Sequence, residues 1–377
     1  MLLSGIFPPI TTPFYPDGEV HHNEVYYKKI EANVERYSRT PIAGMVVQGS
    51  TGEAILLSDQ ERRDVLKAAL AAAAPNKVMI AGTGVESAHE TLRLNEYAAE
   101  LGYDAAMVRT PHYYKKQMLT ANLLAFYRTV ADRSALPIII YNFPQVTGYD
   151  MPAEVVIELA GHPNIVAIKE SSGNLDKVKA MVEGTRHIKR QATVTETFEA
   201  VTPRMLKAAA AESEKQSREL VSVASLAGSA EAKEGRTSSP VVVDSASKPS
   251  SSAVTVVGKL KTRQKEVGFQ LMVGAAHQLE PSLGLGAAGA ILAFACPAPM
   301  ACYEIYAALK DGDTALAREK QERIKLATQR VGDLGVPGMK YAMDLNGYYG
   351  GPSRLPFLPL SGEQKAEIEK LMAGIKS

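Results

Sequence analysis

Residues 165–174 read IVAIKESSGN and place a lysine directly after a run of four apolar residues. A short apolar run bounded by polar residues and glycine is typical of a buried parallel strand, so Lys169 stands where that strand is expected to end. Two interpretations of Lys169 follow. Its ammonium group reaches back into water, as a long basic side chain at a strand end commonly does, or it is a buried amine used for chemistry. This stretch alone leaves both open.

Similar apolar runs recur along the chain and alternate with segments of helical periodicity, which favours βα units around a parallel sheet. Two of the helices have start signals, because Ser58 with Glu61 and Ser87 with Glu90 fit the S-x-x-E capping box. The expected strands are 6–10, 43–48, 78–82, 105–109, 138–142, 165–169, 270–274 and 289–294. They predict an α/β fold, a (β/α)8 TIM barrel over residues 1–297, with an open doubly wound sheet as the structural alternative.

Two regions depart from this alternation. After Phe294 the pattern is wholly helical, so residues 298–377 are expected to form a C-terminal helical region packed on the barrel. Residues 192–266 form a long insertion between the sixth and seventh strands, and its middle is rich in Ser, Ala, Lys and Glu. This composition predicts a flexible surface segment. A small β unit is the alternative, in which PVVVD (240–244) pairs with AVTVVG (253–258) as a hairpin.

Composition excludes several classes of function. The 42 Lys and Arg residues nearly balance the 41 Asp and Glu residues, so the overall charge predicts neither nucleic acid nor an anionic membrane surface as a partner. No apolar run approaches the roughly 20 residues that span a bilayer, and no signal peptide is recognisable. Cys296 and Cys302 lie in one apolar stretch and are expected to be core thiols of a protein in a reducing compartment. We expect a cytoplasmic protein.

In a barrel of this kind the active site lies at the carboxyl ends of the strands. The polar residues expected there include the loop GSTGE (49–53), Tyr113 and Tyr114 of TPHYY, Tyr141 and Lys169. GSTGE offers backbone N–H groups and two hydroxyls as a cradle for a carboxylate or phosphate, although an ordinary glycine-rich turn is the better explanation of this loop taken alone. It lacks the lysine of a P-loop, and GTGVES (82–87) lacks the third glycine of the dinucleotide fingerprint.

A desolvated lysine at a barrel mouth can attack a ketone and form a Schiff base. The resulting iminium accepts electrons, so a pyruvate-like carbon can lose a proton or break a carbon–carbon bond without a metal, and a phenol such as Tyr141 can move the protons. The seven histidines show no H-E-x-x-H or H-x-x-E-H spacing, and no G-x-S-x-G elbow is present. These motifs therefore predict neither a metal site nor a serine hydrolase, and we expect no cofactor.

Five segments, GSTGE, IAGTG, TPHYY, YNFPQVTG and IKESSGN, resemble in order and spacing the N-acetylneuraminate lyase and dihydrodipicolinate synthase family of Schiff-base aldolases. The resemblance covers about residues 4–190 and 268–360. VVQGSTGE and the tail VPGMKYAMDLNGYYGGPSRLPF are especially similar to 4-hydroxy-2-oxoglutarate aldolase. The insertion has no recognised counterpart.

The resemblance implies roles for individual residues. Lys169 is the expected Schiff-base lysine, Tyr141 the proton-relaying tyrosine, and Ser50 and Thr51 hold the carboxylate of a 2-keto acid. Four further positions are expected to bind or line the substrate site: Tyr113, which in this family often reaches a neighbouring subunit's site, Ser171, Ile291 and Gly274. The resemblance also implies a homotetramer or homodimer.

Departures from the family pattern bear on the substrate. Dihydrodipicolinate synthases read like Y-N-x-P-x-R-T-G after the tyrosine, where the arginine holds the carboxylate of the aldehyde, but this chain has Val146 there. Gly274 is followed by Ala275 and Ala276, where the aldolases have Gly-Ser. We expect a lyase that cleaves 4-hydroxy-2-oxoglutarate to pyruvate and the aldehyde glyoxylate. The alternatives are a 4-hydroxy-tetrahydrodipicolinate (dihydrodipicolinate) synthase, a 2-keto-3-deoxy-sugar-acid aldolase, or a catalytically weak keto-acid-binding protein.

Overall fold

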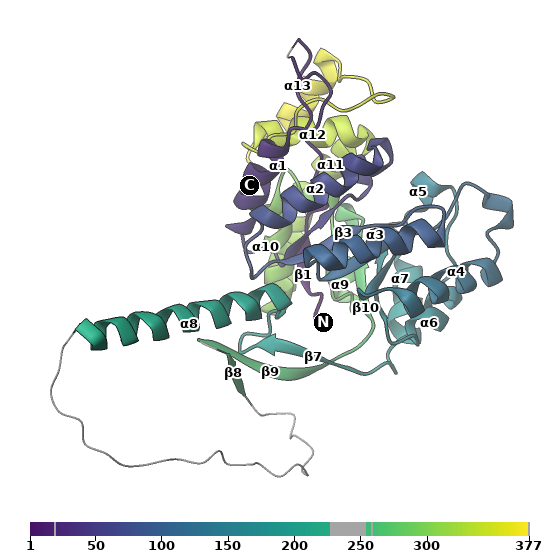
Figure 1. Cartoon of the computed structure of the whole chain (residues 1–377). Helices are drawn as coiled ribbons and strands as arrows, with labels where there is room; N and C mark the ends of the chain where they lie inside the picture. The colour runs from purple at the N-terminus through teal and green to yellow at the C-terminus, as the bar shows by residue number, and fades with distance from the viewer. Residues whose placement is uncertain (19, 227–253, 258, 376–377) are drawn as a thin grey trace, which may run out of the picture.

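A parallel sheet of eight strands, curved into a barrel, forms the centre of the molecule (Figure 1). The computed structural model describes residues 1–18, 20–226, 254–257 and 259–375. The barrel strands are β1 (Gly5–Phe7), β2 (Gly44–Val47), β3 (Val78–Gly82), β4 (Ala105–Arg109), β5 (Ile138–Asn142), β6 (Ile165–Glu170), β10 (Gln270–Val273) and β11 (Gly289–Ile291). Their order is β1-β11-β10-β6-β5-β4-β3-β2.

Three backbone hydrogen bonds join the two ends of this sheet. The N–H of Ala43 donates to the carbonyl of Ile6 at 3.0 Å, that of Val46 to Pro8 at 3.0 Å, and that of Ile10 to Val46 at 2.9 Å. The expected (β/α)8 barrel is therefore confirmed, and the open sheet is excluded. The first strand is shorter than expected because Pro8 and Pro9 have no N–H to donate. The last ends at Ile291, and residues Ala293–Ala295 turn into the 3-10 helix η5.

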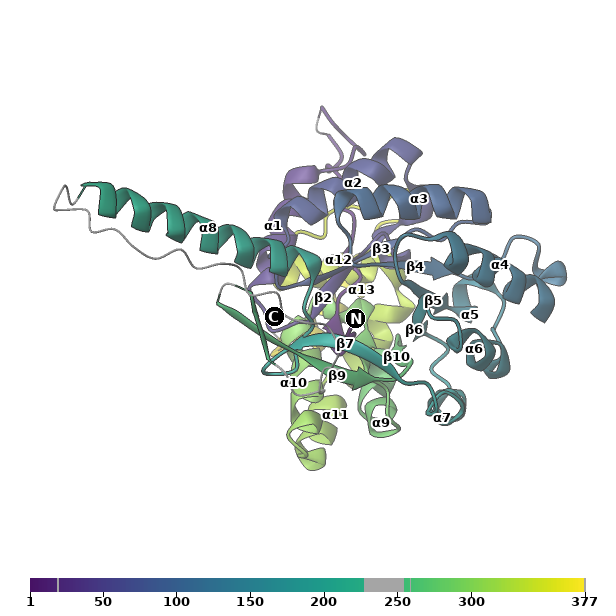
Figure 2. The same ribbon diagram turned by 60° about the horizontal axis from the view of Figure 1, so that its bottom comes forward.

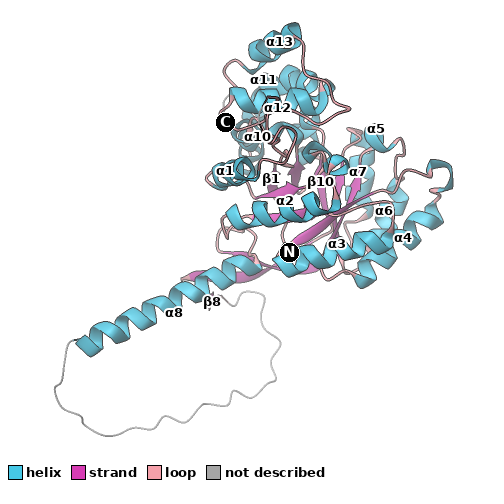
Figure 3. Ribbon diagram, turned by 45° about the horizontal axis from the view of Figure 1, so that its top comes forward, coloured by secondary structure: helices cyan, strands magenta, loops and turns pink. Residues whose placement is uncertain are grey.

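Helices surround the strands (Figure 3). Around the barrel they are α1 (Tyr27–Ser38), α2 (Asp59–Ala72), α3 (Ala88–Leu101), α4 (Thr120–Arg133), the short α5 (Pro144–Thr147), α6 (Ala153–Ala160), α7 (Leu175–Gly184), α9 (Leu279–Gly284) and α10 (Pro299–Lys310). Ser58 and Glu61 form the predicted capping box at α2. Ser87 caps α3 by accepting the Glu90 N–H, whereas the Glu90 carboxylate pairs with Arg93. The helical C-terminal region continues with α11 (Thr314–Asp333), α12 (Gly335–Leu345) and α13 (Gly362–Met372).

The barrel interior is packed with apolar side chains, one or more from each strand. They form one buried cluster that includes Phe7, Val46, Ile80, Met107, Ile139, Ala167, Met272 and Ile291. Their neighbours along the strands, such as Val108 and Ile140, belong to the larger cluster that contacts the helices. Because side chains alternate between the two faces of a strand, the next inward positions lie two residues further along, at the carboxyl ends.

The inserted region contributes a second, antiparallel sheet of order β7-β9-β8. Its elements are β7 (Arg190–Thr195), α8 (Pro203–Leu226), β8 (Thr255–Val257) and β9 (Leu260–Val267), and α8 projects away from the barrel (Figure 2). β8 and β9 form a hairpin, and the suggested pairing of PVVVD with AVTVVG falls on residues outside those that the structure describes. The other predicted strand, PVVVD, and the segment 227–253 expected to be flexible lie outside the described residues.

Arginine side chains attach this insertion to the amino ends of the barrel strands. The Arg190 guanidinium donates to the carbonyls of Ala160, His162 and Ile165, in and before β6. Arg204 of α8 donates to the carbonyl of Lys77 before β3, and its guanidinium lies 3.8 Å from the Asp104 carboxylate before β4. The insertion therefore lies at the end of the barrel opposite to the expected active site.

The predicted core thiols are confirmed, because Cys296 and Cys302 are both buried and unpaired. Within the described ranges, no helix combines the length and the apolar character that a membrane crossing needs. The cytoplasmic location expected from the sequence stays a prediction.

Replacing Arg204 with Met is expected to destabilise the protein more at pH 8 than at pH 5. Burial raises the pKa of Asp104 to about 6, although the Met79 N–H and the Arg204 charge oppose this shift. In the folded protein the carboxyl is therefore ionised above about pH 6, where Arg204 compensates its charge, and protonated below. We expect a loss of about 1 to 3 kcal/mol in the free energy of unfolding at pH 8, measured with urea, and a smaller loss at pH 5.

Lys207→Met, at an exposed position of the same helix, is the matched control and should change stability little at either pH. Equal losses for Arg204→Met at both pH values would contradict a charge contact with Asp104.

Candidate active site

Three polar side chains stand side by side at the carboxyl end of the barrel. The strand register pairs Arg109 of β4 with Tyr141 of β5, and Tyr141 with Lys169 of β6. Each lies two residues after a side chain of the barrel interior, Met107, Ile139 and Ala167, and each therefore points inward. Lys169 is only 4% exposed, so the interpretation that its ammonium group reaches bulk water is wrong.

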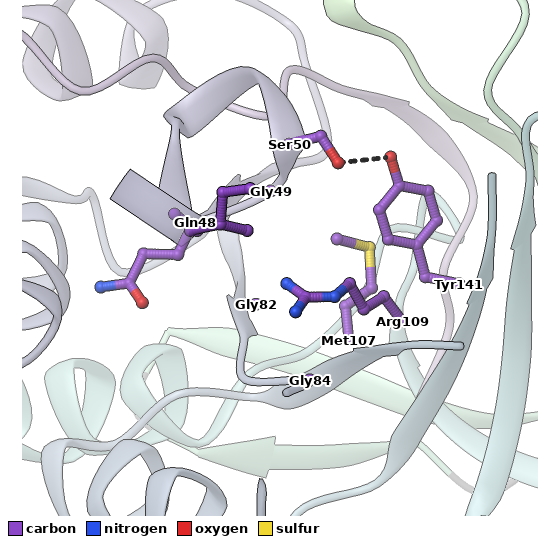
Figure 4. Close-up of a pocket in the computed structure, with 10 residues that line it drawn as sticks. Gln48, Gly49, Ser50, Gly82, Gly84, Met107, Arg109 and Tyr141 are labelled. Atoms are coloured by element: carbon purple, nitrogen blue, oxygen red, sulfur yellow. Dashed lines mark hydrogen bonds between the residues drawn. The ribbon is translucent and has the colours of Figure 1, made fainter. Parts of the chain in front are cut away.

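A chain of contacts links Lys169 to the GSTGE loop. The Lys169 Nζ lies 4.1 Å from the centre of the Tyr141 ring. The Tyr141 hydroxyl lies 3.3 Å from the Ser50 Oγ, within hydrogen-bond distance (Figure 4). Tyr141 also stacks on Phe143, with ring centroids 5.9 Å apart. Lys169, Tyr141 and Ser50, all predicted from the sequence, are therefore brought together.

The GSTGE loop forms a tight turn after β2. Residues Ser50–Gly52 form the 3-10 helix η1, and the carbonyl of Gly52 accepts a hydrogen bond of 2.6 Å from the Thr12 hydroxyl. Glu53 follows in the left-handed region, with φ of 53°. Thr51 lies in the same turn as Ser50 but is not among the residues that line the pocket beside it. Its expected contact with a carboxylate stays a prediction.

A buried ion pair fixes the end of this loop to the C-terminal region. The Glu53 Oε1 lies 2.5 Å from the Lys340 Nζ of α12, and both side chains are almost completely buried. The Glu53 Oε2 accepts the backbone N–H of Arg354 at 2.9 Å, and Lys340 donates to the carbonyl of Pro352 at 2.7 Å. The C-terminal helices therefore brace the loop that carries Ser50. Sequence reasoning missed this role, although a lysine within the apolar helix VPGMKYAM was a signal for it.

A second polar network holds the loops that follow β5 and β6. The Asn142 amide donates to Asp150 at 2.8 Å and to Glu170 at 3.1 Å. Glu170 also accepts the backbone N–H of Ser172 at 2.7 Å and lies 3.2 Å from the Lys177 Nζ. Because Glu170 and Asn142 are the strand neighbours of Lys169 and Tyr141, they point outward, away from these two side chains.

Ser171 and Gly274 are placed against each other. A Cβ atom at Gly274 would lie 1.9 Å from the Ser171 Oγ, so only glycine leaves room for this serine. The Ser171 Oγ is buried and has no hydrogen-bond partner among the described residues. Ile291 is fully buried in the barrel interior. These three predicted positions lie in or at the barrel, and their contact with a substrate stays a prediction.

Tyr113 and Val146 are largely exposed to solvent. Tyr113 is 76% exposed and packs edge-on against Tyr114, with ring centroids 5.1 Å apart. Val146 is 56% exposed, and the neighbouring Gln145 donates to the carbonyl of Ser172 at 3.1 Å. The expected contact of Tyr113 with a neighbouring subunit's site stays a prediction. In the described part of the chain, no group of three His, Cys, Asp or Glu side chains is placed to hold a metal ion.

A small pocket that is open to solvent lies beside Tyr141. Figure 4 shows the Arg109 guanidinium reaching into it, across from the hydroxyls of Ser50 and Tyr141. Sequence reasoning treated Arg109 only as the last residue of a strand. The alternation of inward and outward positions along β4 was the signal that could have identified it as a site residue. The pocket is lined by Gln48, Gly49, Ser50, Ala54, Ile55, Gly82, Gly84, Met107, Arg109 and Tyr141.

Lys340→Met is expected to lower the free energy of unfolding by about 3 to 5 kcal/mol, because it leaves the Glu53 carboxylate buried without its cation. The double variant Glu53→Gln with Lys340→Met should lose less than Lys340→Met alone. The coupling free energy between Glu53 and Lys340 is measured by denaturant unfolding of the unaltered protein, both single variants and the double variant. Lys365→Met, at an exposed position, is the control. If the double variant lost as much stability as the two single variants together, a buried ion pair would be contradicted.

Known proteins match this chain along nearly its whole length. The model of the "Dihydrodipicolinate synthetase family" matches residues 2–238 and 246–375. A 4-hydroxy-tetrahydrodipicolinate synthase from Xanthomonas axonopodis pv. citri (strain 306) is 41% identical over 182 residues, which are 48% of this chain and 58% of that protein. That match thus spans little more than half of the relative. The synthase of the same name from Methanothrix thermoacetophila is 27% identical over 98% of this chain and 96% of the relative.

Solved structures share the fold. A prophage protein of the dihydrodipicolinic acid synthase family from E. coli K12, in complex with pyruvate, has a TM-score of 0.72 and 23% identity, covering 100% of this chain and 99% of that one. Dihydrodipicolinate synthase from Aquifex aeolicus has a TM-score of 0.71 and 23% identity, covering 99% and 98%. These likenesses support the barrel architecture.

The relatives bear on two expectations from the sequence. Those reported above are named as synthases, so the expectation of an enzyme of the lyase class is confirmed. The closer similarity to 4-hydroxy-2-oxoglutarate aldolase stays a prediction. The family model matches the chain on both sides of a short gap, and one relative aligns with it over almost the full length. The chain therefore belongs to the dihydrodipicolinate synthetase family.

Proposed function

We propose that this protein is a class I lyase in which Lys169 forms a Schiff base with pyruvate, or with the pyruvate half of a 4-hydroxy-2-keto acid. The reaction we favour is the reversible cleavage of 4-hydroxy-2-oxoglutarate to pyruvate and glyoxylate. The observation that carries the proposal is the continuous contact from the buried Lys169 amine to the Tyr141 ring and from the Tyr141 hydroxyl to Ser50. The pyruvate bound to a family member of the same fold supports the substrate class.

In the first step, the Lys169 amine attacks the C2 carbonyl, and loss of one water gives a protonated imine. The C1 carboxylate lies at the GSTGE turn, where the hydroxyls of Ser50 and Thr51 donate to it. Tyr141 supplies a proton to the departing hydroxyl, because its phenol lies between the amine and Ser50.

In the second step, Tyr141, which gave up its proton in the first step, takes the proton of the 4-hydroxyl. The electrons of the C3–C4 bond move into the iminium, glyoxylate leaves, and an enamine remains on Lys169. Protonation at C3 and hydrolysis by water then release pyruvate and restore the amine. Lys169 and Tyr141 act in both steps.

A second candidate is 4-hydroxy-tetrahydrodipicolinate synthesis from pyruvate and aspartate semialdehyde, which the names of the relatives favour. It would begin with the same imine. Against it stands the uncharged, largely exposed Val146, at the position where the resemblance implies an arginine for the aldehyde's carboxylate. The two candidates are distinguished by measuring turnover of the purified protein with 4-hydroxy-2-oxoglutarate and, separately, with pyruvate plus aspartate semialdehyde.

The assembly into a homotetramer or homodimer stays a prediction. The exposed pair Tyr113 and Tyr114 supports it, because aromatic side chains are enriched where subunits meet.

Treatment with pyruvate and borohydride is expected to reduce the imine and leave a stable adduct on Lys169, identified by mass analysis of peptides. Lys169→Met should abolish the adduct. Lys179→Met, at an exposed position of the following helix, should retain it. An adduct on another lysine, or none in the unaltered protein, would rule out the proposed mechanism.

Tyr141→Phe is expected to slow borohydride trapping of pyruvate and to lower kcat for cleavage by about 10² to 10⁴ fold, since the proton carrier for imine formation and for cleavage is lost while the amine and ring remain. Pyruvate release measures this rate. Tyr149→Phe, in the neighbouring loop, is the matched control and should keep full activity. Near-normal turnover by Tyr141→Phe would show that another group moves the proton.

A further inference from the structure

Arg109 is the third member of the row at the barrel mouth, and the reaction described above does not use it. It stands beside Tyr141 on the side away from Lys169. Neighbouring strands lie about 4.7 to 4.9 Å apart, so the backbones of Arg109 and Lys169 are separated by roughly twice that distance, with Tyr141 between them. A molecule attached to Lys169 would have to extend past Tyr141 to meet the guanidinium, which Figure 4 shows inside the pocket that Tyr141 also lines.

The charge of Arg109 is only loosely matched by protein groups. Its nearest carboxylate is Glu86, 3.6 Å away, which is longer than a hydrogen bond. Glu86 is shared, because it also accepts the N–H groups of His112 and Tyr113 and lies 2.9 Å from the His112 Nδ1. The Nε–H of Arg109 is buried and has no hydrogen-bond partner among the residues that the structure describes.

A second arginine adds to the positive charge around this pocket. Burial lowers the pKa of Arg62, and the nearby charge of Arg109 lowers it further. Arg62 does not line the pocket, whereas Arg109 does. Arginine presents several donors in a planar fork that fits a carboxylate, and such charge-assisted pairs are the strong ones in a partly buried site.

We propose that Arg109 binds the second carboxylate of the substrate, at the end remote from the imine. This inference rests on the proposed function and narrows its substrate class. The aldehyde that leaves or enters carries a carboxylate, as glyoxylate does, and neutral sugar-type aldehydes are disfavoured. Arg109 at the end of β4 thereby supplies the positive charge that the resemblance implies at position 146, where this chain has the uncharged Val146.

The test compares two substrates that differ at the remote end. 4-Hydroxy-2-oxoglutarate has a carboxylate there, and 4-hydroxy-2-oxopentanoate has a methyl group. Arg109→Gln is expected to lower kcat/KM for the diacid by about 10 to 100 fold, mainly through KM, and to change it less than about threefold for the monoacid. Arg109→Lys keeps the charge but loses the planar fork of donors. Its kcat/KM for the diacid should therefore lie between that of the unaltered protein and that of Arg109→Gln. Arg62→Gln is the matched control and should leave the ratio of the two substrates unchanged.

Borohydride trapping of pyruvate separates failure of this inference from failure of the proposed function. Unchanged trapping in Arg109→Gln shows a folded site and supports the inference when it accompanies the selective loss of the diacid. Equal losses for both substrates, or weaker trapping of pyruvate, would overturn it, since Arg109 would then serve the C1 carboxylate or the fold. Absence of an adduct in the unaltered protein would instead refute the proposed function.

Discussion

The burial of Lys169 beside Tyr141 is the constraint on which the rest of the site depends. An amine removed from water is costly to keep in a protein interior, and no carboxylate lies within ion-pair distance of Lys169 Nζ among the described residues. The face of the Tyr141 ring, 4.1 Å away, is its favourable contact. The adjacent carboxylate of Glu170 points outward, because successive residues of a strand face opposite sides. The barrel thus keeps the Lys169 amine buried beside the Tyr141 ring, without a carboxylate partner among the described residues.

The two ends of the barrel are held by different parts of the chain. At the carboxyl ends, α12 and the segment after it fix the GSTGE turn through Lys340 and Arg354, which both contact Glu53. At the amino ends, the inserted unit is attached through Arg190 and Arg204. The described elements of the insertion therefore lie at the end of the barrel opposite to the proposed active site.

Short-range patterns predicted the barrel and the central site, because apolar runs mark the strands and Lys169, Tyr141 and Ser50 stand at or just after strand ends. Contacts between distant segments were not predicted, as with the Glu53–Lys340 pair, because a lysine in an apolar helix does not indicate which distant residue it meets. The strand β9 was missed because its residues, LKTRQKEV, are mostly polar. Arg109 was overlooked because a charged residue that ends a strand usually reaches solvent, and only the register with Tyr141 shows that it faces the pocket.

The central claim is that one bound keto acid meets Lys169, Tyr141 and Ser50 together. A crystal structure of the protein soaked with pyruvate tests it most directly. The expected result is continuous density from the Lys169 Nζ to C2 of pyruvate, with the carboxylate at the GSTGE turn and the Tyr141 hydroxyl within hydrogen-bond distance of the bound molecule. Pyruvate bound at this site with no bond to Lys169, or bound elsewhere, would contradict the account.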